Sequence, residues 1–206
     1  MHPVINIALR AARSAAEQIA HVSDRLERIS IVEDHGGNLV TSMDLDAERT
    51  MLYHLRKAYP DYSVESRISG FTEGADRDHV WMIDPIVSNR NFQRGYGSFC
   101  VSLALRTSRG VVHGVIINPT TNQEYTASRG DGAQLNASRI RTGKQTNLEN
   151  AFVSLDADPA GEPELMARLL AELSALPVQI RVSGCPALDM VNVAAGRLDA
   201  GWCAQQ

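Results

Sequence analysis

The chain has 206 residues, which is enough for one large domain or two small lobes with a buried core. Hydrophobic residues make up 44% of it and charged residues 21%, with a formal net charge of -4, so binding of nucleic acid by phosphate neutralisation is not expected. No apolar run approaches the roughly 20 residues that span a bilayer, and Arg10, Arg13 and Glu17 interrupt any signal-peptide core.

The cysteines indicate a reducing environment. Cys100, Cys185 and Cys203 are odd in number and widely spaced, and no pair has the spacing of a zinc or redox motif. Reduced and mostly buried thiols fit this pattern, so we expect a cytoplasmic protein.

The first half of the chain predicts helices followed by strands. Apolar residues recur at helical spacing over residues 3–28 and again over 44–58. A turn at 35–38 should join two short strands, and a polar loop is expected over 70–77. The expected strands cover residues 29–33, 39–41, 62–66, 80–84, 99–107, 111–118, 124–129 and 133–135.

The last sixty residues follow a different pattern. Strands are expected at 151–155, 178–182 and 198–203, with a loop at 159–163. The helices between them should cover Glu164–Leu176, with four leucines facing inward (Leu165, Leu169, Leu170, Leu173), and Pro186–Ala195. We therefore expect an α+β lobe with an antiparallel sheet over 1–146 and an α/β lobe over 147–206.

Several motifs, in the same order along nearly the whole chain, resemble the inositol monophosphatase family, and most closely its SuhB-like branch. They include Leu39–Asp44 (LVTSMD), Trp81–Pro85 (WMIDP), Thr126–Asn136 (TASRGDGAQLN) and Val193–Asp199 (VAAGRLD). The resemblance implies a layered αβαβα sandwich, here without its final C-terminal elements. It also implies a magnesium-dependent phosphatase of small sugar or inositol phosphates, in which clustered carboxylates hold the ions that activate water.

The first departure from the family pattern is at a metal ligand. The family places a ligand glutamate in a Glu-Glu-Ser-Gly stretch, and the matching residues here run from Arg67 to Gly70. When the Ser-Gly of the family motif is aligned with Ser69 and Gly70, the ligand glutamate falls at Arg67, which is a permanent cation. A register shifted by two residues would bring Glu65 there instead.

The second departure follows Asp84. The family motif Asp-Pro-Leu/Ile-Asp-Gly-Thr becomes Asp84–Asn89 (DPIVSN). Asp84 and the Ile86 carbonyl are kept as remnants of the metal site. Val87 removes a bridging carboxylate, and Ser88 and Asn89 replace the phosphate-binding glycine and the threonine that helps to activate water. The sequence also ends before the family's Trp-Asp motif, which carries the last carboxylate ligand.

Two other carboxylates match family positions. Asp44 corresponds to a supporting acid near the water-activating threonine, and Asp189 to an acid of the second lobe with a structural or substrate-binding role. The departures at the metal site remove carboxylates and add the cation of Arg67, with the cation of Arg90 nearby. A divalent metal ion at this site should therefore meet unfavourable positive charge within a Debye length of about 8 Å. We expect no cofactor, and we expect Arg67 to pair with Asp84 in place of the ion.

Three functions remain open. The first is a catalytically inactive family member acting through protein contacts, as a homodimer or in a larger complex, because an uncovered sheet edge invites pairing. By resemblance, that complex could be the transcription antitermination machinery with RNA polymerase and a Nus factor. The second is an active inositol-1-phosphate phosphatase with a rebuilt site. The third is a metal-free anion-binding protein using Arg67, Arg90, Ser88 and Asn89. Ser69, Ser88 or Cys100 as a nucleophile would need a base, and no histidine stands near them in a recognisable arrangement.

Overall fold

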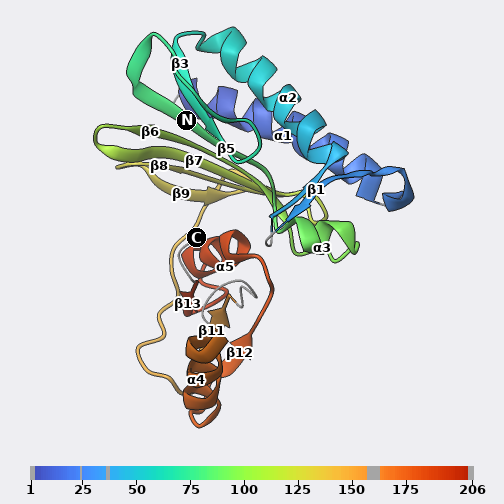
Figure 1. Cartoon of the computed structure of the whole chain (residues 1–206). Helices are drawn as coiled ribbons and strands as arrows, with labels where there is room; N and C mark the ends of the chain where they lie inside the picture. Colours follow the sequence, from blue (N-terminus) through green and yellow to red (C-terminus); the bar gives the residue numbers. More distant parts are fainter. Residues whose placement is uncertain (1–2, 24, 36–37, 157–162, 204–206) are drawn as a thin grey trace.

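The computed structural model describes residues 3–23, 25–35, 38–156 and 163–203. Figure 1 shows two parts: a large sheet with two long helices on one face, and a smaller part of helices and strands on the other side. The helices are α1 (Pro3–Ser23), α2 (Ser42–Ala58), α3 (Asn89–Gln93), α4 (Pro163–Ser174) and α5 (Pro186–Ala194), with a 3-10 turn at Leu26–Arg28.

The strands of the described residues form three sheets. A hairpin contains β1 (Ile31–His35) and β2 (Asn38–Thr41). The eight-stranded sheet has the order β10-β9-β8-β7-β6-β5-β3-β4, and the three-stranded sheet the order β12-β11-β13. The strands of the large sheet are β3 (Tyr62–Ser66), β4 (Gly70–Thr72), β5 (Asp76–Val87), β6 (Cys100–Thr107), β7 (Gly110–Asn118), β8 (Gln123–Ser128), β9 (Gly132–Leu135) and β10 (Ser138–Arg139). Those of the small sheet are β11 (Phe152–Leu155), β12 (Gln179–Arg181) and β13 (Ala200–Trp202).

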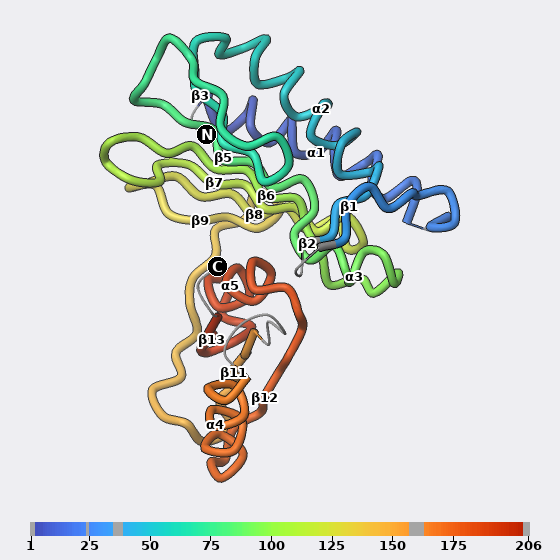
Figure 2. Tube along the Cα trace, viewed as in Figure 1, coloured from blue at the N-terminus to red at the C-terminus, as the bar shows by residue number. Residues whose placement is uncertain are grey.

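The large sheet is antiparallel except where β3 pairs with β5. There the two strands run parallel, with Val64 beside Trp81 and Ser66 beside Ile83. Figure 2 follows the chain from β5 through the consecutive meander of β6, β7, β8 and β9. The parallel pair matters for the site, because it brings the end of β3 beside the end of β5.

The main core lies between this sheet and the two long helices. Helix α1 presents a stripe of buried alanines that allows close approach, among them Ala8, Ala12 and Ala15. Helix α2 contributes Met51 and Leu55, which are fully buried. Sheet residues on the facing side complete one cluster, including Trp81, Ile83, Leu103 and Val115. Burial of apolar surface at about 25 cal/mol per Å² makes this core the main source of stability.

The small part places a helix against the other face of the large sheet. All pairs in the three-stranded sheet are parallel. Helix α5 lies between this sheet and the large one, in contact with β6, β7 and β13, and α4 lies at the far end of the molecule (Figure 1). The layered order of helices and sheets confirms the predicted layered sandwich. The lobe boundary at 146/147 remains a prediction. In the described part of the chain, no helix is long and apolar enough to cross a membrane.

Most predicted elements are present, with several corrections. The first helix ends at Ser23, whose hydroxyl donates to the Ala20 carbonyl, and a separate 3-10 turn follows. The predicted polar loop at 70–77 is wrong, because β4 pairs with β3 and β5 already begins at Asp76. A positive φ of 73° at Gly70 allows the turn that returns the chain to β3.

The outer helix differs in burial. The four leucines of α4 that were expected to face inward are only half-buried, and α4 has no buried residue. Helix α3 and strand β10 were not predicted, because both are short. Residues 36–37 of the predicted turn and 159–162 of the predicted loop lie outside the described residues.

Candidate functional site

The site is built where β5 ends. The pairing of β5 with β6 is irregular between Asp84 and Val87, and Ser88 then adopts a left-handed φ of 70°. Non-glycine residues rarely take this conformation outside turns. This turn ends β5 and starts α3 at Asn89, so the chain reverses between Asp84 and Asn89.

Arg67 reaches this turn because of the parallel strand pairing. The Arg67 backbone N–H donates to the Ile83 carbonyl at 3.0 Å, which continues the register of β3 and β5. Its side chain therefore extends beside Asp84, the next residue of β5. The Nε atom of Arg67 lies 2.9 Å from Oδ1 of Asp84, so the predicted pair is present.

Asp44 comes from the first turn of α2. Its side chain is 0% exposed, and its Oδ2 accepts hydrogen bonds from the Thr41 backbone N–H at 2.8 Å and the Thr41 hydroxyl at 2.7 Å. A carboxylate in the first turn of a helix also interacts favourably with the helix dipole. The local sequence thus fixes this acid at the start of α2, beneath the end of β5.

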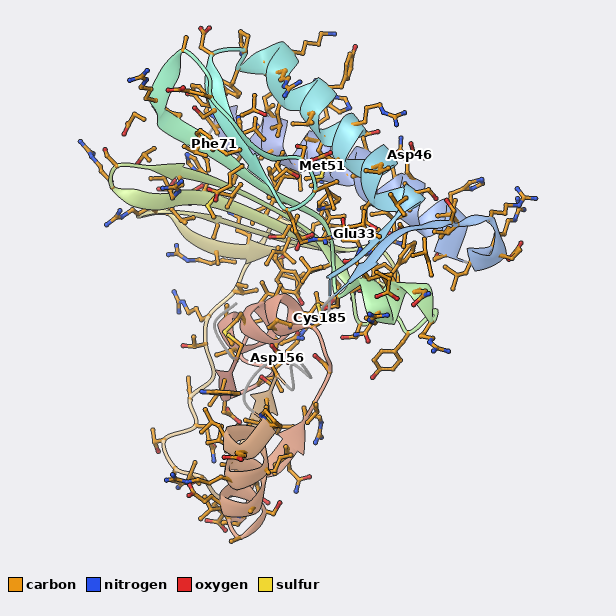
Figure 3. The ribbon with its side chains drawn as sticks, in the orientation of Figure 1. Glu33, Asp46, Met51, Phe71, Asp156 and Cys185 are labelled. Carbon is orange, nitrogen blue, oxygen red and sulfur yellow. The ribbon has the colours of Figure 1, made fainter. Side chains whose placement is uncertain are left out.

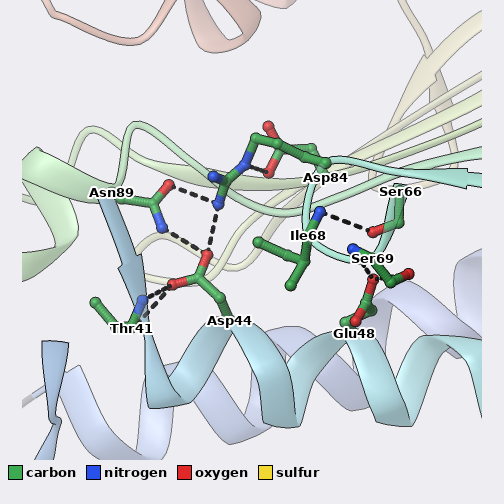
Figure 4. A network of polar contacts seen from close by, with 9 residues as sticks. Thr41, Asp44, Glu48, Ser66, Ile68, Ser69, Asp84 and Asn89 are labelled. Atoms are coloured by element: carbon green, nitrogen blue, oxygen red, sulfur yellow. Dashed lines mark hydrogen bonds and ion pairs between the residues drawn. The ribbon is translucent and has the colours of Figure 1, made fainter. Parts of the chain in front are cut away.

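These residues form one polar network, shown in Figure 4. Nη2 of Arg67 lies 2.7 Å from Oδ1 of Asp44 and 3.1 Å from Oδ1 of Asn89. The Asn89 side-chain amide donates to the same Asp44 oxygen at 2.5 Å. Arg67 therefore bridges the two carboxylates, and Asn89 closes a triangle with Asp44 and Arg67.

The electrostatics of Asp84 reflect two opposing causes. Burial raises the pKa of its carboxyl above the ordinary value, and the neighbouring Asp44 adds to this. The guanidinium of Arg67 acts against it, by charge and by hydrogen bonding. The shift towards a higher pKa shows that Arg67 does not fully offset the burial of Asp84.

A family comparison matches residues 1–205 to the inositol monophosphatase family. The chain belongs to this family. It is 38% identical to the Nus factor SuhB of Pseudomonas aeruginosa over 98% of this chain and 77% of that protein. It is 33% identical to the Nus factor SuhB of Escherichia coli K12 over 97% of this chain and 75% of that protein.

Solved structures of the inositol monophosphatase family agree in fold. The extragenic suppressor protein suhB from Bartonella henselae superimposes with a TM-score of 0.95 at 29% identity, over 99% of this chain and 79% of that one. The Thermotoga maritima IMPase superimposes with a TM-score of 0.85 at 26% identity, over 98% of this chain and 77% of that one.

The anion-binding candidates are engaged differently from one another. Arg90 pairs with Asp34 of β1, at 2.5 Å between Nη2 and Oδ1, while Arg67 binds Asp44, Asp84 and Asn89. Both guanidinium groups therefore already hold carboxylates.

Two other acidic residues considered for the site, Glu65 and Asp189, lie outside the network around Arg67. Glu65 pairs with Arg106 at 3.2 Å, and both side chains are about half exposed. The alignment that puts Arg67 at the metal-ligand position therefore holds, and the alignment shifted by two residues, which would put Glu65 there, is wrong. Asp189 lies in α5, is 5% exposed, and accepts a hydrogen bond from Ser183 at 2.9 Å.

One further acid, which also belongs to the family resemblance together with Leu39–Asp44, has a role that only the structure indicates. Glu48 is 7% exposed, and its Oε1 accepts from the Ser69 backbone N–H at 3.1 Å and from the Ser69 hydroxyl at 2.8 Å. It stands one helical turn after Asp44, a spacing that puts both acids on one face of α2. The sequence signal for this role is the pair of acids at i and i+4 within an otherwise apolar helix face.

Proposed function

We propose that this chain is a family member without phosphatase chemistry that acts through protein contacts as a structural or regulatory subunit. The observation that carries the proposal is the position of Arg67. Its guanidinium lies within 2.9 Å of one oxygen of Asp84 and 2.7 Å of one oxygen of Asp44. In the family pattern, the position of Arg67 carries a carboxylate that helps to hold magnesium.

The side chains at this place do not fit magnesium. Mg²⁺ requires nearly octahedral oxygen coordination at about 2.0–2.1 Å. Among the described residues, no group of three or more acidic, histidine or cysteine side chains is arranged to hold an ion. The two carboxylates here share a permanent cation, and Val87 offers no oxygen from its side chain. A dication beside Asp84 would therefore have to displace or repel Arg67.

The names of the similar proteins indicate the class of protein partner that we propose for this chain. The Pseudomonas aeruginosa and Escherichia coli proteins are named Nus factors, at 38% and 33% identity. We infer that this chain also associates with the transcription antitermination machinery, including RNA polymerase and Nus factors. Self-association as a homodimer and a cytoplasmic location belong to the same proposal.

A direct experiment combines catalysis with metal binding. Hydrolysis of inositol 1-phosphate is assayed with Mg²⁺ over a concentration series, and Mg²⁺ is titrated into the protein by calorimetry. The proposal expects neither phosphate release nor binding heat. Turnover that depends on added Mg²⁺ would overturn it in favour of the phosphatase alternative.

The partner is tested separately. Tagged protein is mixed with purified RNA polymerase and Nus factors of the host, and complexes are separated by size. Co-elution at micromolar concentration supports the proposal, and separate elution of every component contradicts the choice of partner.

Phosphate titration without metal tests the anion-binding alternative. In that alternative, an anion would have to displace Asp44 or Asp84 from Arg67, or Asp34 from Arg90.

A further inference from the structure

Two thiols face each other at the junction of the two parts of the molecule. Cys100 begins β6 in the large sheet, and Cys185 immediately precedes α5. Their sulfur atoms lie 4.0 Å apart although the residues are 85 positions apart in the sequence. Both side chains are 0% exposed. Figure 3 labels Cys185 at the end of the small part that faces the large sheet.

The thiols lie at the centre of an apolar contact between the parts. Val87, which pairs with Cys100 across β5 and β6, and Ile116 of β7 approach from the large sheet. Ala187, Leu188 and Val191 approach from α5. A covalent bond at this point would fix the contact between the large sheet and α5.

The two thiols differ in acidity. The hydrogen bond with Cys100 lowers the pKa of Cys185, and contacts with Ser88 and the Leu188 backbone N–H lower it further, against the effect of burial. The same hydrogen bond raises the pKa of Cys100, and burial adds to this. Cys185, at the N-terminus of a helix, is therefore the better nucleophile.

We propose that Cys100 and Cys185 form a redox modification site, which a hydroperoxide converts into a disulfide joining β6 to α5. The sulfur atoms would move from 4.0 Å to the bond length of about 2.05 Å. The proposal requires rotation of both side chains within the apolar cluster. The thiols are both free in the structure described.

The reaction balances in two steps. The thiolate of Cys185 attacks the terminal oxygen of the hydroperoxide, the O–O bond breaks, and the remaining oxygen leaves as water or an alcohol after taking up a proton. Cys100 then attacks the sulfenic sulfur of Cys185, the S–O bond breaks, and the oxygen leaves as water with the Cys100 proton. Two electrons pass from the sulfur atoms to the peroxide. Because both thiols are buried, the oxidant enters when α5 separates locally from the sheet.

The third cysteine provides an internal reference. Cys203 is exposed, so peroxide reaches it without any opening of the structure. It must be removed when the product is analysed, because an exposed thiol also forms disulfides between chains. The Cys203→Ser variant therefore isolates the buried pair.

The test treats Cys203→Ser protein with hydrogen peroxide, quenches it, and alkylates the remaining thiols in denaturant. We expect both alkylatable thiols to be lost, the intact mass to fall by two hydrogen atoms, and a non-reduced digest to contain a peptide linking Cys100 to Cys185. Dithiothreitol should restore both thiols. The oxidised protein should unfold at a higher temperature than the reduced protein, since the bond closes a long loop.

Two further variants check the order of attack. With Cys100→Ser in the same background, Cys185 should accumulate as sulfenic acid that a dimedone probe captures. With Cys185→Ser, Cys100 should stay unmodified at the same peroxide dose. The inference is overturned if both buried thiols of Cys203→Ser remain fully alkylatable under peroxide that oxidises Cys203 in the unmodified chain. It is also overturned if only intermolecular disulfides form.

Discussion

Arg67 and Asp84 meet across the parallel pair of β3 and β5, with Nε and Oδ1 2.9 Å apart. The same guanidinium reaches Asp44 on α2, so it joins the sheet to the helix that covers it. Because Asp44 is fully buried, this cation neutralises a charge that would otherwise be isolated from water.

Replacing Arg67 by alanine should therefore destabilise the fold strongly. Arg67→Ala leaves Asp44 buried without its cation, and removal of one partner of a buried ion pair costs about 3–5 kcal/mol. The free energy of unfolding, measured by urea denaturation, should fall by this amount. The matched control is Arg106→Ala, since Arg106 pairs with Glu65 at the surface of the same sheet, where such pairs contribute about 0–1 kcal/mol. Equal losses in the two variants would contradict the bridging role of Arg67.

The hydroxyl of Thr41 should contribute measurably through Asp44. It donates to Oδ2 of Asp44 at 2.7 Å in a buried setting. Thr41→Val keeps the shape and removes the donor, and the loss of a hydrogen bond to a charged group costs about 1.5–3 kcal/mol. Thermal unfolding should show a lower midpoint than in the parent protein.

Thr50→Val is the control for that measurement. Thr50 lies in α2, the helix that carries Asp44, and donates to Gln18 at 3.0 Å in an exposed setting. Its replacement should change stability by less than about 0.5 kcal/mol. A loss as large as that of Thr41→Val would mean that the exchange of a threonine hydroxyl for a methyl group, and not the bond to Asp44, sets the effect.

The layered fold could be predicted because its signals are local and periodic. The buried alanine stripe of α1 and the alternation along β6 and β7 each specify one buried face. The small outer part was harder, because its strands have three or four residues and α4 buries none of its leucines completely. Short, half-buried elements carry a weak periodic signal.

The site could be predicted in part. The arginine at residue 67 was identified from its motif, and its pairing with Asp84 followed from charge. The contact of Arg67 with Asp44 and Asn89 could not follow, because it depends on the parallel register and on the left-handed turn at Ser88. Likewise, no spacing in the sequence indicates that Cys100 and Cys185 meet across the two parts.

The carboxyl of Asp189 should contribute a distinct pH dependence. Burial raises its pKa, and the charge of Asp156 adds to this, while the Ser183 hydroxyl opposes it. A folded-state pKa above the unfolded value means that the folded protein binds the proton more tightly. The stabilising contribution is thus complete below the ordinary aspartate pKa and is lost as pH rises through the raised value.

Asp189→Asn keeps the shape and an acceptor for Ser183 but cannot ionise. Unfolding free energies measured by urea denaturation from about pH 3 to pH 7 should therefore decline less with rising pH in this variant than in the parent. The exposed Asp131→Asn is the control and should follow the parent curve. Superimposable curves for Asp189→Asn and the parent would show that this carboxyl does not titrate differently in the folded state.

Restoring the family's acidic residues should restore magnesium binding. The double variant Arg67→Glu with Val87→Asp removes the cation between Asp44 and Asp84 and introduces two carboxylates, one at the place of Arg67 and one three residues after Asp84. Without metal these acids repel one another, so the variant should unfold at a lower temperature than the parent. Because an ion that binds only the folded state stabilises it by mass action, millimolar Mg²⁺ should raise the unfolding temperature of the variant and leave the parent unchanged. The control, Arg106→Glu, makes the same arginine-to-glutamate exchange at the exposed pair with Glu65, and Mg²⁺ should not shift its unfolding temperature. A parent protein that Mg²⁺ stabilises as much as the double variant would mean that Arg67 does not take the place of the ion.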